Sequence, residues 1–195
     1  MWTKIKWGIR LVLIAMVAAF LHYTLPQRDV VRLTGTYNRM TEVGANSIFY
    51  ASPDSGTTTA TVDRRDIRFI EAVFPDGGVM VYRNEDTGWV WPPYFKYDSS
   101  NLQAEATNYV STKEKPEWVA VTHYGGRMPI FSIYPNAVKI RPVDGPDVQL
   151  IPWVNIIVLG LLALGFGVLW RVWPPFKERM IEPAKDDLNN TLDAM

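Results

Sequence analysis

LVLIAMVAAFLHYTLPQ, residues 11–27, and VQLIPWVNIIVLGLLALGFGVLW, residues 148–170, decide the fold of this chain. The first is 17 and the second 23 residues long, and neither contains Asp, Glu, Lys or Arg. At about 1.5 Å per residue, about 20 helical residues cross the hydrocarbon core of a bilayer. A bilayer offers backbone polar groups no water, so each stretch predicts a membrane-spanning helix that satisfies its own hydrogen bonds.

Basic residues beside the two predicted spans indicate how the chain crosses the membrane. The tails, residues 1–10 and 171–195, carry seven of them, Lys4, Lys6, Arg10, Arg171, Lys177, Arg179 and Lys185. The inner flanks carry five, Arg28, Arg32, Arg39, Lys139 and Arg141. Positive charge favours the cytoplasmic side, which predicts a bacterial inner-membrane protein with both tails cytoplasmic and residues 28–147 periplasmic. Cleavage after Ala19 as a signal peptide is the alternative, and it also places the domain outside.

The segment between the predicted spans is long enough for one compact domain. Its 120 residues carry 13 Lys and Arg against 15 Asp and Glu, a net charge of −2, so we predict no nucleic-acid partner. The chain has no cysteine, which excludes disulfides, thiolate zinc sites and cysteine nucleophiles. Since no cofactor motif or spaced set of metal ligands is present either, we predict no cofactor and no metal.

Short strand patterns separated by turns predict a mainly β domain with one helix. The predicted strands are residues 29–37, 46–51, 65–74, 79–83, 118–124, 130–134 and 137–142. Pro75-Asp76-Gly77-Gly78 predicts a hairpin, because both glycines can supply the positive φ that such turns need, and residues 118–134 predict a second hairpin around Gly125-Gly126. Residues 53–63 predict an exposed loop. Residues 100–110 predict the helix, with Ser100 as N-cap and Gln103 at the capping-box position. The predicted fold class is a membrane α+β protein.

Small residues four positions apart predict close packing of the membrane helices. They are Ala15 and Ala19 in the first span, and Ala163 and Gly167 in the second. We interpret this pattern as pairing of the two spans within one chain, although the same pattern would serve a homo-oligomer.

Few residues of the domain suggest catalysis. His123 is its one histidine, and no carboxylates are spaced around it as a metal site or catalytic triad requires. Alternation along its strand places His123 on an apolar face, which indicates a partly buried ring. Glu85, Asp86 and Asp98 flank an aromatic segment, a pattern seen at sites that cleave sugars and also at polar turns. We predict no catalytic residue.

The stretch WVWPPYFKY, residues 89–97, is the most distinctive part of the domain. Aromatic rings give a large contact area at low entropic cost. The rings of this stretch therefore predict a recognition surface for a protein, a glycan or lipid headgroups, made of Trp89, Trp91, Tyr94, Phe95 and Tyr97. A rigid wrap that seals one end of the β core is the equal alternative.

Several strings of the sequence are more specific than these patterns. They are HYTLPQ at 22–27, TYNR at 36–39, RFIEAV at 68–73, YRNEDTGW at 82–89, WPPYFK at 91–96, DSSNLQAE at 98–105 and VTHYG at 121–125. Together they resemble a family of alphaproteobacterial membrane proteins catalogued only as a domain of unknown function. The resemblance extends from the first span into the second and implies a bacterial inner-membrane setting. It implies no reaction and no catalytic residue.

These observations predict a non-catalytic accessory or scaffolding component of a membrane or envelope assembly. Its partners would be the lipid bilayer and another membrane or periplasmic protein. A periplasmic ligand-binding or sensing module that uses residues 89–97 is the first alternative. An envelope glycan hydrolase that uses Glu85, Asp86 or Asp98 is the second. An aromatic cleft lined by a carboxylate would favour the two alternatives, and a flat aromatic patch would favour the accessory protein.

Overall fold

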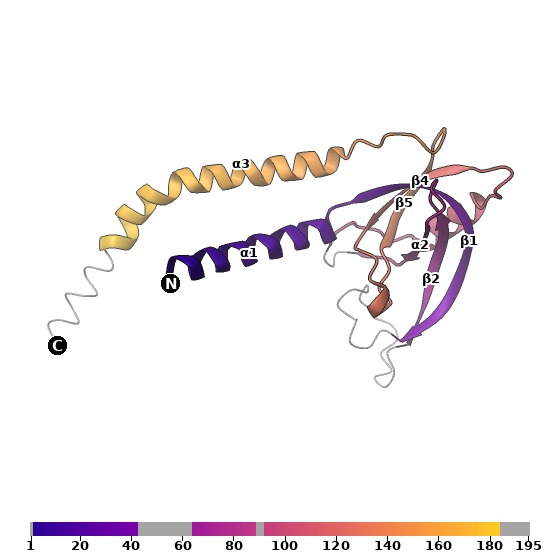
Figure 1. Cartoon of the computed structure of the whole chain (residues 1–195), viewed down its shortest axis with the longest axis horizontal. Helices are drawn as coiled ribbons and strands as arrows, with labels where there is room; N and C mark the ends of the chain where they lie inside the picture. Colours follow the sequence, from indigo (N-terminus) through magenta and orange to yellow (C-terminus); the bar gives the residue numbers. More distant parts are fainter. Residues whose placement is uncertain (1, 43–63, 89–91, 184–195) are drawn as a thin grey trace. The chain divides into compact units, whose positions relative to one another are not determined.

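The computed structural model describes residues 2–42, 64–88 and 92–183 of the chain. It divides into two compact units, residues 1–151 and 152–195, which are described separately. The first unit holds helix α1 (Trp2–Thr24), a barrel of five strands and helix α2 (Ser99–Asn108), as Figure 1 shows. The second holds helix α3 (Trp153–Phe176) and a π-helical turn, η3 (Lys177–Ile181). The predicted strand 46–51 and loop 53–63 lie outside the described residues.

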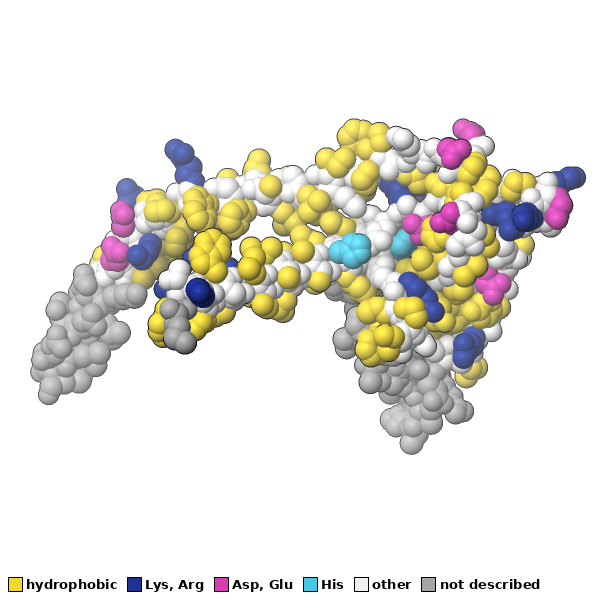
Figure 2. Space-filling view, viewed as in Figure 1, with side chains coloured by type: hydrophobic (Ala, Val, Ile, Leu, Met, Phe, Trp, Pro, Cys, Tyr) yellow, Lys and Arg dark blue, Asp and Glu magenta, His cyan; other side chains and the backbone are white. Residues whose placement is uncertain are grey.

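Helices α1 and α3 are long and apolar enough to cross a membrane. No residue in the most apolar part of either helix is buried, and Figure 2 shows hydrophobic side chains along each of them. Helix α1 begins at Trp2 rather than at Leu11, because Lys and Arg before the uncharged stretch are themselves good helix formers. The predicted fold class is confirmed, since two candidate membrane helices flank a β domain with one short helix.

Five strands form a closed barrel. They are β1 (Gln27–Glu42), β2 (Arg64–Val73), β3 (Val79–Asn84), β4 (Trp118–Tyr124) and β5 (Asn136–Pro142). The order around the barrel is β1-β2-β3-β5-β4, and β4 pairs back onto β1. All pairs are antiparallel except β3 and β5, which are parallel. A five-stranded barrel of this order, with α2 between β3 and β4, has the architecture of the OB fold.

Strand β1 closes the barrel because it pairs with two strands along its length. Residues 27–32 pair with β4, and residues 32–42 pair with β2. The register shifts between Leu33 and Gly35, a bulge that lets β1 bend from one partner toward the other. Gly35 lies at this bulge, and a Cβ there would meet only the end of the flexible Glu71 side chain, with Oε2 3.0 Å away.

Apolar side chains that alternate along the strands fill the barrel interior. The main cluster from the strands consists of Val31, Leu33, Ile70, Ala72, Tyr82, Val119, Val121, Ala137 and Ile140. Helix α2 packs on the barrel through Leu102 and Ala106, which belong to the same cluster. The α2 helix therefore owes its position to its apolar face as well as to its cap.

The predicted hairpin forms between β2 and β3, but only one of its two glycines adopts a positive φ. Gly77 has φ 88°, as such a turn requires, but Gly78 does not adopt a positive φ. Its N–H instead donates to Asp76 Oδ1 at 2.9 Å, a local Asx interaction that holds the turn without a second left-handed residue.

The predicted cap of α2 is wrong by two residues. The N-cap is Asp98, whose Oδ1 accepts from the backbone N–H of Asn101 at 3.0 Å, rather than Ser100. A carboxylate accepts this hydrogen bond more strongly than a hydroxyl does. Gln103 does not form a capping box, because it bonds instead to Asn84 and to the Phe69 carbonyl.

The second predicted hairpin is wrong in its second strand. Residues 130–134 do not pair with β4; a short 3-10 helix, η2 (Pro129–Phe131), lies there, and β4 pairs with β5. Pro129 has no N–H for a ladder, and Ser132 adopts a left-handed φ of 53°. These two residues prevent the alternating sequence from continuing as a strand.

Candidate functional site

A cluster of tyrosines joins the end of α1 to the barrel. The Tyr94 hydroxyl donates to the Thr24 carbonyl at 2.5 Å, and its ring stacks on Tyr124 with centroids 4.8 Å apart. Tyr124 also meets Tyr23 edge-on, and Gly125 N–H donates to the Tyr23 carbonyl at 2.9 Å. Gly125 has φ 83°, and a Cβ there would lie 3.4 Å from the Tyr23 ring, so only glycine fits easily. The aromatic segment is thus bonded to the helix end through Tyr94.

Lys96, which belongs to the same segment, is buried, with 7% of its surface exposed. Its Nζ donates to Asn84 Oδ1 at 2.5 Å and to the Ala137 carbonyl at 2.7 Å. Burial lowers the pKa of Lys96 to about 7, and the charges of Asp86 and Glu85 oppose this only in part. A neutral amine has two N–H donors, which matches the two acceptors, whereas an ammonium has three.

Two buried asparagines bond across the junction of β3, β5 and α2. Asn84 Nδ2 donates to the Ser99 carbonyl and to Gln103 Oε1, both at 2.8 Å. Asn136 accepts from the Glu85 N–H at 2.9 Å and donates to the Glu85 carbonyl at 3.1 Å. The amide side chains therefore act in place of ladder hydrogen bonds, which satisfies backbone groups that a barrel interior would otherwise leave unpaired.

A second buried polar group lies where β1, β3 and β4 meet. The Tyr82 hydroxyl donates to Asp29 Oδ2 at 2.6 Å, and His123 Nε2 lies 2.9 Å from the same oxygen. Burial alone would raise the pKa of Asp29, but the contacts with His123 and Tyr82 outweigh it and hold that pKa below its usual value. His123 is buried, as predicted; its contact with Asp29 is not aligned as a hydrogen bond, and Nδ1 has no such bond among the described residues.

The three candidate carboxylates each have a structural partner. Glu85 pairs with the buried guanidinium of Arg83, with Oε2 and NH1 2.9 Å apart. Asp86 accepts from Ser99 twice, from the N–H at 2.8 Å and from Oγ at 3.0 Å. Asp98 caps α2. Each carboxylate is therefore held by a contact with β3 or at the start of α2.

Phe95 and Tyr97 point outward from the same segment, with 51% and 59% of their surfaces exposed. Phe95 has φ 51°, which is uncommon for a residue with a side chain, and it lies between the inward residues Tyr94 and Lys96. The two outward rings border an open hollow between α2 and β5, whose rim also includes Glu105 and Lys139. Within residues 92–97, Tyr94 and Lys96 thus face inward, whereas Phe95 and Tyr97 are exposed.

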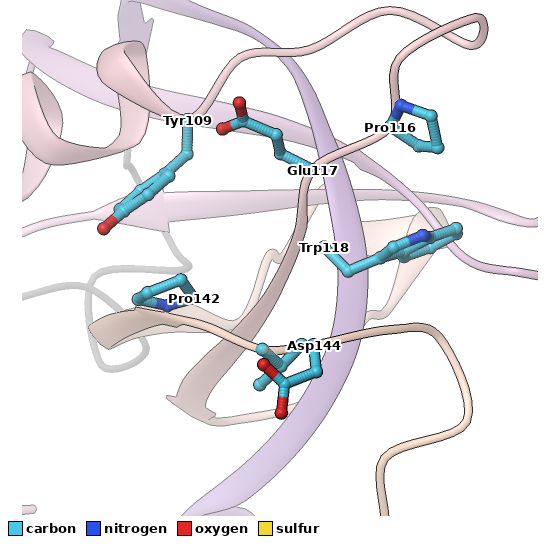
Figure 3. Close-up of a pocket in the computed structure, with 7 residues that line it drawn as sticks. Tyr109, Pro116, Glu117, Trp118, Pro142 and Asp144 are labelled. Carbon is cyan, nitrogen blue, oxygen red and sulfur yellow. The ribbon is translucent and has the colours of Figure 1, made fainter.

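A second hollow lies at the opposite end of the barrel, where β4 begins and β5 ends. Figure 3 shows the Tyr109 ring and Pro142 on one side of it and the Trp118 indole on the other. The carboxylates of Glu117 and Asp144 also line this hollow, but they point in different directions. They therefore do not form a converging acid–base pair.

The remaining predicted site residues stay predictions. Trp89 and Trp91 lie outside the described residues. The four small residues lie on the apolar helices, two on α1 and two on α3, and they are Ala15, Ala19, Ala163 and Gly167. Within residues 2–42, 64–88 and 92–183, no three His, Asp or Glu side chains are grouped as metal ligands would be.

Sequence reasoning missed the buried polar residues. These are Arg83, Asn84, Lys96 and Asn136, each at most 7% exposed. Charged and amide side chains beside prolines and turns are usually exposed, so the residue types at these four positions indicate polar loops rather than buried sites. The alternation of Tyr94 and Lys96 against Phe95 and Tyr97 was the one local signal of an inward lysine.

These features define a class of protein, a small closed β-barrel with an apolar helix of membrane-crossing length on each side in the sequence. Residues 3–177 match the family described as "Protein of unknown function (DUF1523)", and the chain belongs to this family. The chain is also 35% identical over 142 residues to an uncharacterized protein of Haemophilus influenzae, which covers 71% of this chain and 75% of that protein. No solved structure matches. The predicted membership of a domain-of-unknown-function family is confirmed.

Proposed function

We propose that this protein is a non-catalytic accessory or scaffolding component of a bacterial inner-membrane assembly. In this proposal α1 and α3 span the membrane, both tails are cytoplasmic and the barrel lies in the periplasm. The observation that carries the proposal is the outward aromatic face of Phe95 and Tyr97, on a segment that Tyr94 bonds to the end of α1. This arrangement holds a recognition surface at a fixed place beside the predicted membrane surface.

The shape of that surface supports a protein partner over a small ligand. Pockets for small molecules enclose most of the ligand surface, whereas the hollow beside Phe95 and Tyr97 is open. Exposed aromatic rings are typical anchors of protein interfaces, and Glu105 and Lys139 on the rim could add complementary charge contacts. A partner that covers the hollow would bury both rings.

The polar residues support a role without catalysis. Glu85, Asp86 and Asp98 have structural partners, and His123 contacts Asp29 inside the barrel. A general acid or base must reach a substrate atom within hydrogen-bond distance. The carboxylates that the glycan hydrolase alternative requires are instead engaged in the fold, so we do not propose that activity.

A labelling experiment tests the topology. The chain has no cysteine, so Val79→Cys on the β2–β3 hairpin and Lys4→Cys and Lys177→Cys on the tails each give one reactive site. Cells with a permeabilised outer membrane are treated with a membrane-impermeant maleimide. We expect labelling at position 79 in these cells, and at positions 4 and 177 only after lysis. The reverse pattern would place the barrel in the cytoplasm and refute the proposal.

A crosslinking experiment tests the recognition surface. A photoreactive amino acid at position 97 should give one discrete adduct with another protein, whereas the same residue at the distant, exposed position 79 should not. Phe95→Ser should abolish the adduct in protein that still unfolds cooperatively, because about half of that residue is exposed. Equal adducts at both positions, or none at position 97, would contradict a specific surface.

Complementation separates this role from catalysis. Asp86→Asn and Asp98→Asn each keep one oxygen, which can still accept the backbone N–H of Ser99 or of Asn101. Both variants should therefore complement a deletion strain as well as the parent chain does. Loss of complementation by a variant that is folded and still forms the position-97 adduct would indicate an acid–base role for that carboxylate.

A ligand-binding or sensing module is the second candidate function. OB barrels host oligosaccharide and oligonucleotide sites, although a shared fold does not by itself carry a function. The net charge of −2 between the spans disfavours a nucleic acid, which leaves a neutral glycan that stacks on the exposed rings. Saturable quenching of tryptophan fluorescence by glycan fragments, lost in Tyr97→Ser, would favour this candidate over the protein partner.

A further inference from the structure

The loop between β4 and β5 carries an apolar tip that the recognition surface does not include. Ile130 has 91% of its surface exposed, more than any other large apolar side chain in the described part of the chain, and Phe131 has 55% exposed. Burial of such side chains is favourable, so a soluble domain would be expected to fold them inward. The exposure of Ile130 and Phe131 therefore needs a physical explanation.

The tip is held outward by its own backbone. Met128 and Ile133 bond to each other twice, N–H to carbonyl in both directions at 3.1 Å, and η2 forms the turn between them. Ser132 adopts φ 53°, a conformation that costs free energy in residues other than glycine and asparagine. Arg127 fixes the base of the loop by donating to the Ile133 carbonyl at 3.0 Å and by lying over the Tyr134 ring, 4.1 Å from its centroid.

The loop begins at the end of α1. Gly125, its first residue, donates to the carbonyl of Tyr23, the penultimate residue of the helix. Tyrosine at the end of an apolar helix is typical of the membrane–water interface. Ile130 follows Gly125 by five residues, so it lies within about 18 Å of Gly125, which is bonded to the end of α1, even if the chain between them were fully extended.

The charge of the strand pair and its loop suits a lipid surface. Residues 118–143 contain no Asp or Glu, and Arg127 lies in the loop itself. Basic residues beside an apolar tip favour the anionic headgroups of a bacterial bilayer, and an acidic residue there would oppose binding. The β2–β3 hairpin also exposes an apolar residue, Val79, but it lies at the other end of the barrel, at the level of Arg32 and Trp118.

We propose that the β4–β5 loop inserts Ile130 and Phe131 into the interfacial layer of the bilayer, on the side where α1 ends. The loop is then a second contact of the barrel with the membrane, and Arg127 lies at headgroup level. Insertion would limit rotation of the barrel about the α1 axis and would fix which side the Phe95 and Tyr97 rings face. The inference rests on the part of the proposed function in which α1 spans the membrane.

Fluorescence of single-cysteine variants tests this inference. Ile130→Cys, Val79→Cys and Val12→Cys are labelled with an environment-sensitive fluorophore, and each full-length protein is reconstituted into vesicles of phosphatidylethanolamine and phosphatidylglycerol. Nitroxide lipids with shallow or deep labels quench probes in the bilayer, and iodide quenches probes in water. Position 79 is the matched control, because Val79 is an exposed apolar residue at 80% exposure on the far hairpin.

We expect the probe at position 130 to be quenched most by the shallow nitroxide and at least threefold less by iodide than the probe at position 79. The probe at position 12, near the middle of α1, should respond most to the deep nitroxide. Iodide access at position 130 equal to that at position 79, with position 12 still quenched by lipid, would overturn the loop proposal alone. Absence of lipid quenching at position 12 would overturn the span itself, and the loop proposal with it.

Two further outcomes separate lipid from protein as the occupant. Shielding of position 130 from iodide without lipid quenching, and only at high protein-to-lipid ratio, would show contact with a second copy of the chain and refute the lipid proposal. As a control for folding, Ile130→Asp should keep the parent melting temperature in detergent, since 91% of that side chain is exposed. In vesicles this variant should reduce the protection of a probe at Met128→Cys.

Discussion

Replacing Lys96 with methionine should remove most of the dependence of stability on pH between 7 and 9. Burial lowers the pKa of Lys96 from 10.5 to about 7, against smaller opposing effects of Asp86 and Glu85. Between pH 7 and pH 9 the unfolded chain binds more protons at Lys96 than the folded chain does, so the free energy of unfolding rises as pH increases. At about 1.4 kcal/mol per pKa unit, the gain from pH 7 to pH 9 is about 2 kcal/mol.

The assay is denaturant unfolding of the purified protein in detergent, followed by tryptophan fluorescence at pH 7, 8 and 9. Methionine has a similar length and no charge, so it removes the titration and retains much of the packing. The control is Lys139→Met on β5, which is exposed and should keep the slope of the parent protein. The measurements end at pH 9 because burial raises the pKa of Tyr82, Tyr94 and Tyr124. Above the unfolded tyrosine pKa of about 10, these three tyrosines lose protons more readily in the unfolded chain, which lowers the free energy of unfolding. An unchanged slope in the Lys96 variant would refute the idea that this amine is neutral when buried.

Three further substitutions test the contacts at the barrel. Tyr94→Phe should lower the free energy of unfolding by about 1 kcal/mol through loss of the bond to α1, whereas Tyr97→Phe should change it little. Asp29→Asn should flatten the loss of stability below pH 4 in acid titrations, since a depressed carboxyl pKa stabilises the fold above the unfolded pKa and that gain is lost on acidification. Gly77→Val should cost about 1 kcal/mol or more because of its positive φ, and Gly126→Val, without a positive φ and with open space, should cost less; equal losses would contradict the turn assignment.

Local chemistry made several elements of the fold predictable. The apolar stretches predicted helices because length and charge decide whether a segment can cross a bilayer. The β2–β3 hairpin followed from Gly77, whose conformation few other residues adopt cheaply. Strand 118–124 was predicted and found at Trp118–Tyr124, since its alternation is regular and no proline interrupts it.

Pairing between strands that are far apart in the sequence could not be predicted from local sequence patterns. Closure of the barrel depends on β1 bonding to both β2 and β4 and on one parallel contact between β3 and β5, and no local signal encodes these choices. The sequence IFSIY alternates as a strand does, but Pro129 and Ser132 turn it into the β4–β5 loop tip. The burial of Lys96 likewise depends on Asn84 and on the Ala137 carbonyl, which reach it from β3 and β5.

The buried polar residues have a structural role where β3 meets β5. The β3–β5 seam has one paired position, Arg83 with Asn136, so the ladder there is the shortest in the barrel. Side chains complete it, since Asn136 bonds both backbone groups of Glu85, and Lys96 bonds the Ala137 carbonyl. An unpaired polar group inside a barrel is costly, so these hydrogen bonds contribute to closure of the barrel. Among the described residues, the rings of Phe95 and Tyr97 and the tip of the β4–β5 loop are exposed, and both are carried by loops bonded to the end of α1.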